Sequence, residues 1–325
     1  MCTSIAMKWG GGYFGRNMDV EYSFGEQVAV TPRRYPLRFW RQPEQAEHFA
    51  LIGMAHVAGG RPLYAEAANE KGLYMAGLNF PGSAWYEPNL PADCDAVAPY
   101  ELIPWVLGSC ATLAEAKARL ARFRPLGVPL AADLPLAPLH WHIADRTGAL
   151  VLEATREGVR LYDDPVGVLT NNPPFPFHQL NLRQYQHLTA RPTENRLAPA
   201  LPLEAFGQGM GAIGLPGDAS PASRYVRAAF CKLNAPDPGG ELERVSDFFH
   251  LLDAVAMVRG SVLTPEGKWD MTTYACCFSA GAGTYYYKPH GNSRLSAVRL
   301  AGADLDSGEV QLFPLCQEQD VRMLN

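Results

Sequence analysis

Cysteine at position 2 is the residue whose place in this sequence most directly suggests chemistry. The chain opens Met1-Cys2-Thr3, and an initiator methionine is normally removed when the next residue is small. Cys2 would then carry a free α-amine, whose ordinary pKa of about 7.7–8.0 lets it accept the thiol proton. A thiol with its own base is the N-terminal form of an activated nucleophile. A small residue in a fraying terminus is the alternative.

Two charged residues behind Cys2 could act on its thiol and amine. Residues 3–9 and 13–20 predict a glycine-linked hairpin, which would order the terminus within a sheet. Arg16 would favour the thiolate, and Asp19 would hold the α-ammonium. The period of two puts Arg16 and Asp19 on opposite faces of a regular strand, so their convergence on Cys2 requires a bulge or a strand end. A surface ion pair is the alternative.

Gly10, Gly12 and Gly15 match the letters of the dinucleotide-binding motif G-x-G-x-x-G. That motif opens a helix and is followed about 20 residues later by an acidic residue. Residues 16–24 instead predict an extended segment, and no acidic residue lies within residues 27–41. The sequence therefore indicates no dinucleotide site.

Other polar pairs carry less chemistry. His140 and His142 lie two apart on a predicted strand and face one side, which could begin a metal site. No third or fourth ligand is evident nearby, so we expect no metal. Asp163-Asp164 precedes Pro165 and predicts a solvated turn, not a catalytic dyad.

Composition limits the class of protein. The 325 residues carry 28 basic and 33 acidic side chains, a net charge of −5, and 47% are hydrophobic against 19% charged. A large core is expected, and a phosphate-binding surface for nucleic acid is not. No apolar run approaches a membrane span, and the start lacks a secretory signal, so we expect a cytoplasmic protein. Seven cysteines without CxxC spacing argue against a disulfide scaffold and a zinc ribbon.

The elements that must position these residues are mostly strands joined by short turns, which favours antiparallel hairpins. The predicted strands cover residues 27–31, 49–57, 63–67, 73–79, 139–144, 149–154, 159–162, 271–278, 283–288 and 295–300. Three helices are predicted: one capped by Thr112 and Glu115 with its apolar face running to Phe123, and two more over residues 223–233 and 246–258. Antiparallel sheets with helices on their outer faces give an α+β layered sandwich.

The segment 189–223 is rich in proline and glycine and is longer than an ordinary connector. We interpret it as a packed arm at a subunit contact. A flexible lid is the competing interpretation.

Short blocks with a characteristic order and spacing run along nearly the whole chain. These are Met1-Cys2-Thr3, Gly15-Arg16-Asn17-Met18-Asp19, Glu21-Tyr22-Ser23, Asn69-Glu70-Lys71-Gly72-Leu73, Gly77-Leu78-Asn79-Phe80-Pro81-Gly82, Pro135-Leu136-Ala137-Pro138-Leu139-His140-Trp141, Leu169-Thr170-Asn171-Asn172-Pro173, Gly214-Leu215-Pro216-Gly217-Asp218 and Ser223-Arg224-Tyr225-Val226-Arg227. In the order and spacing of these blocks the sequence resembles the choloylglycine hydrolase family of N-terminal-nucleophile hydrolases, and within it the bile salt hydrolase branch.

This resemblance implies a four-layer αββα sandwich. We expect residues 1–325 to form it as one domain, with 189–223 as an extended loop for subunit assembly. The resemblance implies a cytoplasmic homotetramer without a cofactor or metal. The implied reaction is hydrolysis of the amide that joins a bile acid to glycine or taurine.

The resemblance also implies roles for individual residues. Cys2 resembles the nucleophile, Arg16 and Asp19 the groups that tune and hold it, and Arg224 the second arginine of the site. Asn171 resembles the side chain of the oxyanion hole, a role that suits a neutral donor.

Asn79 resembles the partner of Asn171 and a contact to the departing amine. Penicillin V acylases, in the same family, tend to carry tyrosine at this position, so asparagine favours bile salts. A penicillin V acylase is the alternative with the same mechanism. A steroid-binding protein without turnover is the alternative of another class.

A steroid would require an apolar pocket with few polar groups. We expect Met18, Phe24 and the loop 126–136, with Leu130 and Leu134, to line it. Core packing is the alternative for each of these side chains.

Overall fold

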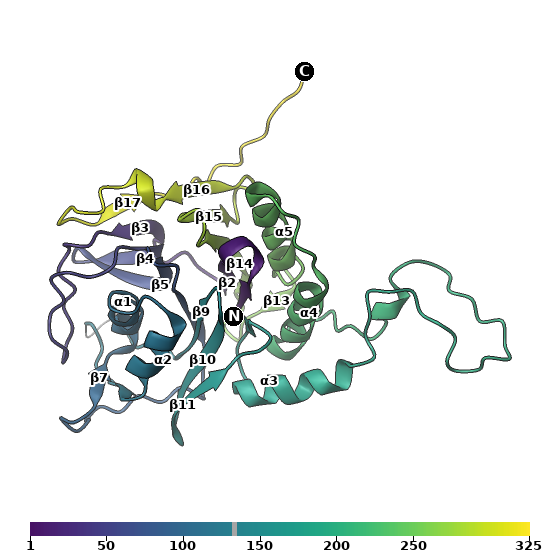
Figure 1. Cartoon of the computed structure of the whole chain (residues 1–325), viewed down its shortest axis with the longest axis horizontal. Helices are drawn as coiled ribbons and strands as arrows, with labels where there is room; N and C mark the ends of the chain where they lie inside the picture. The colour runs from purple at the N-terminus through teal and green to yellow at the C-terminus, as the bar shows by residue number, and fades with distance from the viewer. Residues whose placement is uncertain (132–134) are drawn as a thin grey trace.

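Two antiparallel sheets packed face to face form the centre of the protein, with helices outside them (Figure 1). The structure is a computed structural model that describes residues 1–131 and 135–325. Helices α1 (Leu102–Leu107) and α2 (Leu113–Leu120) cover one sheet, and α4 (Pro221–Asn234) and α5 (Glu241–Asp253) cover the other. This is the predicted four-layer αββα arrangement.

One sheet contains the chain's first strand in its interior. Its order is β12 (Val168–Leu169), β1 (Cys2–Met7), β2 (Tyr13–Val20), β14 (Trp269–Ser279), β15 (Thr284–Pro289) and β16 (Ser296–Arg299), with β13 (Val262–Leu263) paired to β14. The terminus is therefore ordered, as the hairpin pattern predicts, with a strand on each side of β1.

The second sheet faces the first across the larger apolar core. Its order is β11 (Gly158–Asp163), β10 (Gly148–Thr155), β9 (Leu139–Asp145), β6 (Tyr74–Asn79), β5 (Arg61–Asn69), β4 (Leu51–Ala58), β3 (Gln27–Thr31) and β17 (Gln311–Phe313). A short parallel pair, β7 (Asp95–Val97) and β8 (Phe123–Pro125), lies apart from both sheets.

The predicted helices exist, with shifted ends. The α2 cap is half of the predicted box: Thr112 accepts the Glu115 backbone N–H at 3.2 Å, but the Glu115 carboxylate binds the N–H of Ala111. Phe123 is not on this helix and lies in β8 instead. Helix α5 begins five residues earlier than predicted, since its acidic first turn was not recognised as helical.

The short strands β7, β8, β12, β13 and β17 were not predicted, and neither were several helical elements. They are α1, α3 (Phe175–Leu182) and the 3-10 turns η1 (Trp9–Gly11), η2 (Pro99–Glu101), η3 (Arg183–Tyr185), η4 (Met210–Ala212) and η5 (Leu300–Gly302). Most are too short for a helical period to show in the sequence.

Gly15 lets β2 and β14 approach closely beside the site. A Cβ at Gly15 would lie 1.9 Å from the carbonyl oxygen of Cys276. Since Gly15 precedes Arg16, this contact fixes the position of β2 where it carries the site residues.

The segment between α3 and α4 projects away from the body of the molecule (Figure 1). Leu197 is 88% exposed and Phe206 is 91% exposed. These apolar side chains contact solvent in the single chain, which matches the composition of a surface that meets another molecule. Among the residues that the structure describes, no helix is long and apolar enough to cross a membrane.

Candidate active site

Cys2 lies at the start of β1 and is only 2% exposed. In the antiparallel register Cys2 is opposite Met18 and Ser4 is opposite Arg16. These side chains therefore point to one face, between the two sheets. Thr3 and its neighbours on β2 alternate to the opposite face, under α4 and α5.

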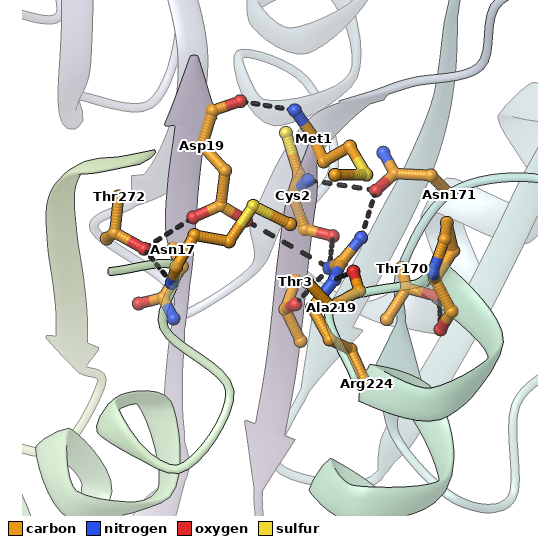
Figure 2. A network of polar contacts seen from close by, with 12 residues as sticks. Met1, Cys2, Thr3, Asn17, Asp19, Thr170, Asn171, Ala219, Arg224 and Thr272 are labelled. Carbon is orange, nitrogen blue, oxygen red and sulfur yellow. Dashed lines mark hydrogen bonds and ion pairs between the residues drawn. The ribbon is translucent and has the colours of Figure 1, made fainter. Parts of the chain in front are cut away.

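The side chain of Asn171 binds the Cys2 backbone directly. Its Oδ1 accepts the Cys2 N–H at 2.9 Å and the Arg224 Nη2 at 2.7 Å (Figure 2). Its Nδ2 donates to the Asn79 carbonyl at 2.7 Å. Because two donors meet one end of the Asn171 side-chain amide and a carbonyl meets the other, these contacts fix the orientation of that amide. Asn79 and Asn171 are thus brought together, as predicted, through the Asn79 main chain.

Arg224 connects α4 to the first residues of the chain. Its Nη1 donates to the Cys2 carbonyl at 2.6 Å and to Thr3 Oγ1 at 2.5 Å, and its Nε donates to the Ala219 carbonyl (Figure 2). Burial lowers the Arg224 pKa, and the charge of Asp19 opposes that effect. Arg224 is therefore a fully buried clamp on β1.

Asp19 lies on the Arg224 face of β2. Its Oδ1 accepts from Thr272 Oγ1 at 2.6 Å, and its Oδ2 lies 4.0 Å from Arg224 Nη1. Burial raises the pKa of Asp19, whereas Arg224 and the terminal amine oppose the rise. Within the described part of the chain, Asp19 Oδ2 has no hydrogen-bond donor.

Met1 is present in this structure, and its amine lies beside Asp19. The amine donates to the main-chain carbonyl of Asp19 and lies 3.3 Å from Asp270 Oδ2. The sequence does not predict a site role for Asp270, because nothing there distinguishes it from a surface carboxylate. It is 6% exposed.

Arg16 points away from Asp19, into the space between the sheets. Its Nη1 donates to the Gly77 carbonyl at 2.6 Å, and Glu66 Oε2 lies 3.7 Å away. Strand β2 is continuous over Tyr13–Val20, and the irregularity lies in its partner β14, between Thr272 and Tyr274. The two charged residues therefore flank β1 from opposite faces, and the bulge considered for β2 is not present.

Two buried histidines hold the backbone that carries Asn171. His140 Nε2 donates to the Thr170 carbonyl at 3.0 Å, and His178 Nε2 donates to the Asn171 carbonyl at 2.9 Å. Burial lowers the pKa of His178, which favours the neutral ring. Glu153 lies 3.1 Å from His140 Nδ1 and also accepts the N–H of Phe175, at the start of α3. Neither His178 nor Glu153 was predicted, because their contacts join distant segments.

The structure also tests the interpretations of the His140 and His142 pair and of the Asp163-Asp164 turn. His142 Nδ1 lies 2.9 Å from Ser4 Oγ. Within residues 1–131 and 135–325, no three His, Cys, Asp or Glu side chains gather to hold a metal ion. The prediction of a solvated turn is wrong for Asp164, which is 4% exposed and accepts the N–H groups of Val166, Gly167 and Val168. Its carboxylate satisfies turn donors that would otherwise be buried unpaired.

An apolar cavity of about 290 Å³ opens next to this site. Met18, which is opposite Cys2, and Phe24 and Leu130 line it as predicted. The other predicted lining residue, Leu134, lies outside the described residues. The remaining lining side chains include Leu63, Tyr64, Tyr100, Ile103, Leu136 and Leu139. Ligand pockets are typically of about 300–1,000 Å³, so the volume of this cavity is just below that range.

The chain is similar to known proteins over its full length. It is 41% identical to a bile salt hydrolase/transferase of Lactiplantibacillus plantarum and 35% identical to one of Clostridium perfringens, with all of each chain covered. Among solved structures, a mutant conjugated bile acid hydrolase from Clostridium perfringens matches with a TM-score of 0.92, 35% identity and full coverage of both chains.

A penicillin V acylase from Agrobacterium tumefaciens shares the fold alone. Its TM-score is 0.75 at 18% identity, over 96% of this chain and 90% of that one. Residues 2–313 match the linear amide C–N hydrolases of the choloylglycine hydrolase family. Because residues 2–313 match this family and full-length relatives are 35% and 41% identical, the chain belongs to the choloylglycine hydrolase family.

Proposed function

We propose that this protein hydrolyses the amide bond of bile acids conjugated to glycine or taurine, with Cys2 as the nucleophile after removal of Met1. The observation that carries the proposal is the apolar cavity that begins at Met18, directly opposite Cys2. A rigid apolar acyl group placed there would present its amide carbonyl at the start of β1. The full-length relatives named for bile salts support the same substrate class.

The first half of the reaction forms a thioester. The Cys2 thiol gives its proton to its own α-amine, and the sulfur attacks the amide carbon. The carbonyl oxygen becomes an oxyanion, which the free N–H of Asn171 Nδ2 and the Asn79 side chain would stabilise. The α-ammonium then returns the proton to the departing nitrogen, and glycine or taurine leaves as an amine.

The second half releases the bile acid. The α-amine takes a proton from water, the hydroxide equivalent attacks the thioester, and the sulfur leaves as the restored thiol. Asp19 Oδ2, a buried acceptor with no donor among the described residues, suits the α-ammonium during both halves. Arg16 would stabilise the thiolate from the opposite face.

Rates on two substrate classes test this proposal. The purified protein should cleave glycocholate or taurocholate faster than penicillin V, and intact mass should show loss of Met1. Faster turnover of penicillin V would favour the acylase alternative. Cys2→Ala should abolish release of glycine while retaining steroid binding; full activity with Met1 in place would overturn the self-base mechanism.

The protein is further proposed to be a cytoplasmic homotetramer that forms one domain and uses residues 189–223 in its contacts. The exposed Leu197 and Phe206 on the projecting segment support that contact. Light scattering tests it: Phe206→Asp should lower the mass in solution. An unchanged tetramer would exclude this segment from the contact, and a monomeric parent chain would exclude the assembly.

A further inference from the structure

Glu66 is a fully buried carboxylate that faces Arg16 across the gap between the sheets. It stands on β5 of one sheet, whereas its partners stand on the other. Its Oε2 accepts from Tyr274 Oη at 2.8 Å and lies 3.7 Å from Arg16 Nη1. Its Oε1 accepts from Tyr285 Oη at 2.6 Å and from Cys276 Sγ at 3.5 Å. The Glu66 carboxylate is therefore fully buried and paired on both oxygens, and the reaction described above gives it no role.

Arg16 has main-chain acceptors in addition to its ion pair with Glu66. Two main-chain carbonyls accept from its Nη1, Gly77 at 2.6 Å and Ala65 at 3.4 Å. Its Nη2 lies 3.5 Å from Met18 Sδ, on the side toward Cys2. Glu66 instead contributes a negative charge on the far side of the guanidinium, at a separation where interior charges interact strongly.

We propose that Glu66 is a positioning residue that acts through Arg16: its charge limits the positive potential that Arg16 exerts on the Cys2 thiol. The inference rests on the proposed roles of Arg16 and Cys2. A bare buried arginine would hold the thiolate so firmly that it becomes a weaker nucleophile, because nucleophilicity falls with basicity. The Glu66 charge counters this effect without moving the guanidinium.

The other groups around Arg16 keep their protons. Burial raises the pKa of Tyr274 and Tyr285 well above the usual value, so both remain donors to Glu66. Burial likewise raises the pKa of Tyr74 on β6 and of Cys276 on β14. Burial also raises the pKa of Glu66, with Arg16 as the main opposing influence.

The opposite face of β1 and β2 carries the remaining charges near Cys2. These are Arg224 on α4, Asp19 on β2 and Asp270 on β14. None of them lies on the Glu66 face, so the test variants leave them in place.

The test is the pH dependence of Cys2 alkylation by iodoacetamide in the Met1-processed protein, with each cysteine resolved by peptide mass spectrometry. In Glu66→Gln the pH midpoint of alkylation should fall by about one unit, which gives about tenfold more thiolate at a pH below both midpoints. An unchanged or higher midpoint would overturn the proposal. No substrate is used, so the result is independent of whether bile salts are cleaved.

Glu101→Gln is the matched control. Glu101 is also fully buried and pairs with an arginine, Arg61 at 2.9 Å, but it lies outside the intersheet site. In Glu101→Gln the pH midpoint of Cys2 alkylation should stay at the parent value. A shift equal to that of Glu66→Gln would indicate that the loss of any buried carboxylate destabilises the fold enough to change Cys2, and it would overturn the proposal.

Tyr285→Phe tests the same proposal if Glu66→Gln does not fold. Tyr285→Phe removes a hydroxyl donor and leaves the carboxylate, so Glu66 takes up a proton at higher pH. The alkylation midpoint should then fall by less than in Glu66→Gln. A rise, or no change, would count against Glu66 acting through Arg16.

Discussion

The side-chain oxygen of Asn171 accepts the backbone N–H of Cys2 at 2.9 Å, so the proposed nucleophile and the asparagine are joined by one hydrogen bond. Arg224 donates to the same oxygen at 2.7 Å. The amide nitrogen of Asn171 must therefore face Asn79, and its second N–H is the oxyanion donor of the proposed mechanism.

Asn171→Ala should lower kcat about 10²–10³-fold, because it removes this oxyanion donor. The neighbouring Asn172 is the control, since its Nδ2 binds Ser83 Oγ at 2.7 Å and does not contact Cys2. Asn172→Ala should change kcat only a few fold. Steady-state rates on glycocholate measure both, and equal losses would assign the effect to the turn as a whole.

Arg224→Gln should destabilise the fold by about 3–5 kcal/mol, because it leaves the buried Asp19 without its ion pair. Arg227, one turn along α4, donates to the Ala254 and Pro216 carbonyls nearer the surface. Arg227→Gln should cost less than about 1.5 kcal/mol. Urea unfolding monitored by tryptophan fluorescence gives both values, and similar losses would contradict the clamp.

Asp218 should stabilise the start of α4 in a pH-dependent way. Hydrogen bonds from Ser220 and Ser223 lower the pKa of Asp218 to about 2. A lowered folded-state pKa gives stability that is present above the unfolded value near 4 and is lost as the pH falls toward 2.

Asp218→Asn should therefore lower the free energy of unfolding at pH 7, by less than about 1 kcal/mol because the side chain is exposed. The difference from the parent chain should disappear near pH 2. Urea midpoints at pH 7, 4 and 2 check this, and a difference that grows on acidification would reverse the sign.

Leu63→Trp should fill the cavity and raise KM for glycocholate by roughly tenfold, since apolar contact supplies the affinity of such sites. Alkylation of Cys2 by a small reagent should be unchanged. Leu242 is 70% exposed on α5, and Leu242→Trp should leave KM as it is. An unaltered KM in Leu63→Trp would place the acyl group elsewhere.

Local patterns predicted much of this molecule and its site. Alternation and turns predicted most long strands, and the period of two correctly separates Arg16 from Asp19. The resemblance supplied Asn171 and Arg224, which the structure brings to Cys2. Local patterns could not show that His178 and Glu153 secure the Asn171 turn, because those contacts depend on how separate elements pack.

The position of β1 determines when the chain can be processed. Strand β1 is buried between β2 and β12, and β12 begins at residue 168. At synthesis rates of about 5–20 residues per second, the ribosome needs roughly ten seconds or more to reach β12. An aminopeptidase can reach the Met1–Cys2 bond during that interval, before β1 is enclosed. On the proposed mechanism, removal of Met1 therefore competes with folding, and fast synthesis with limiting aminopeptidase should yield folded chains that keep Met1 and never become active.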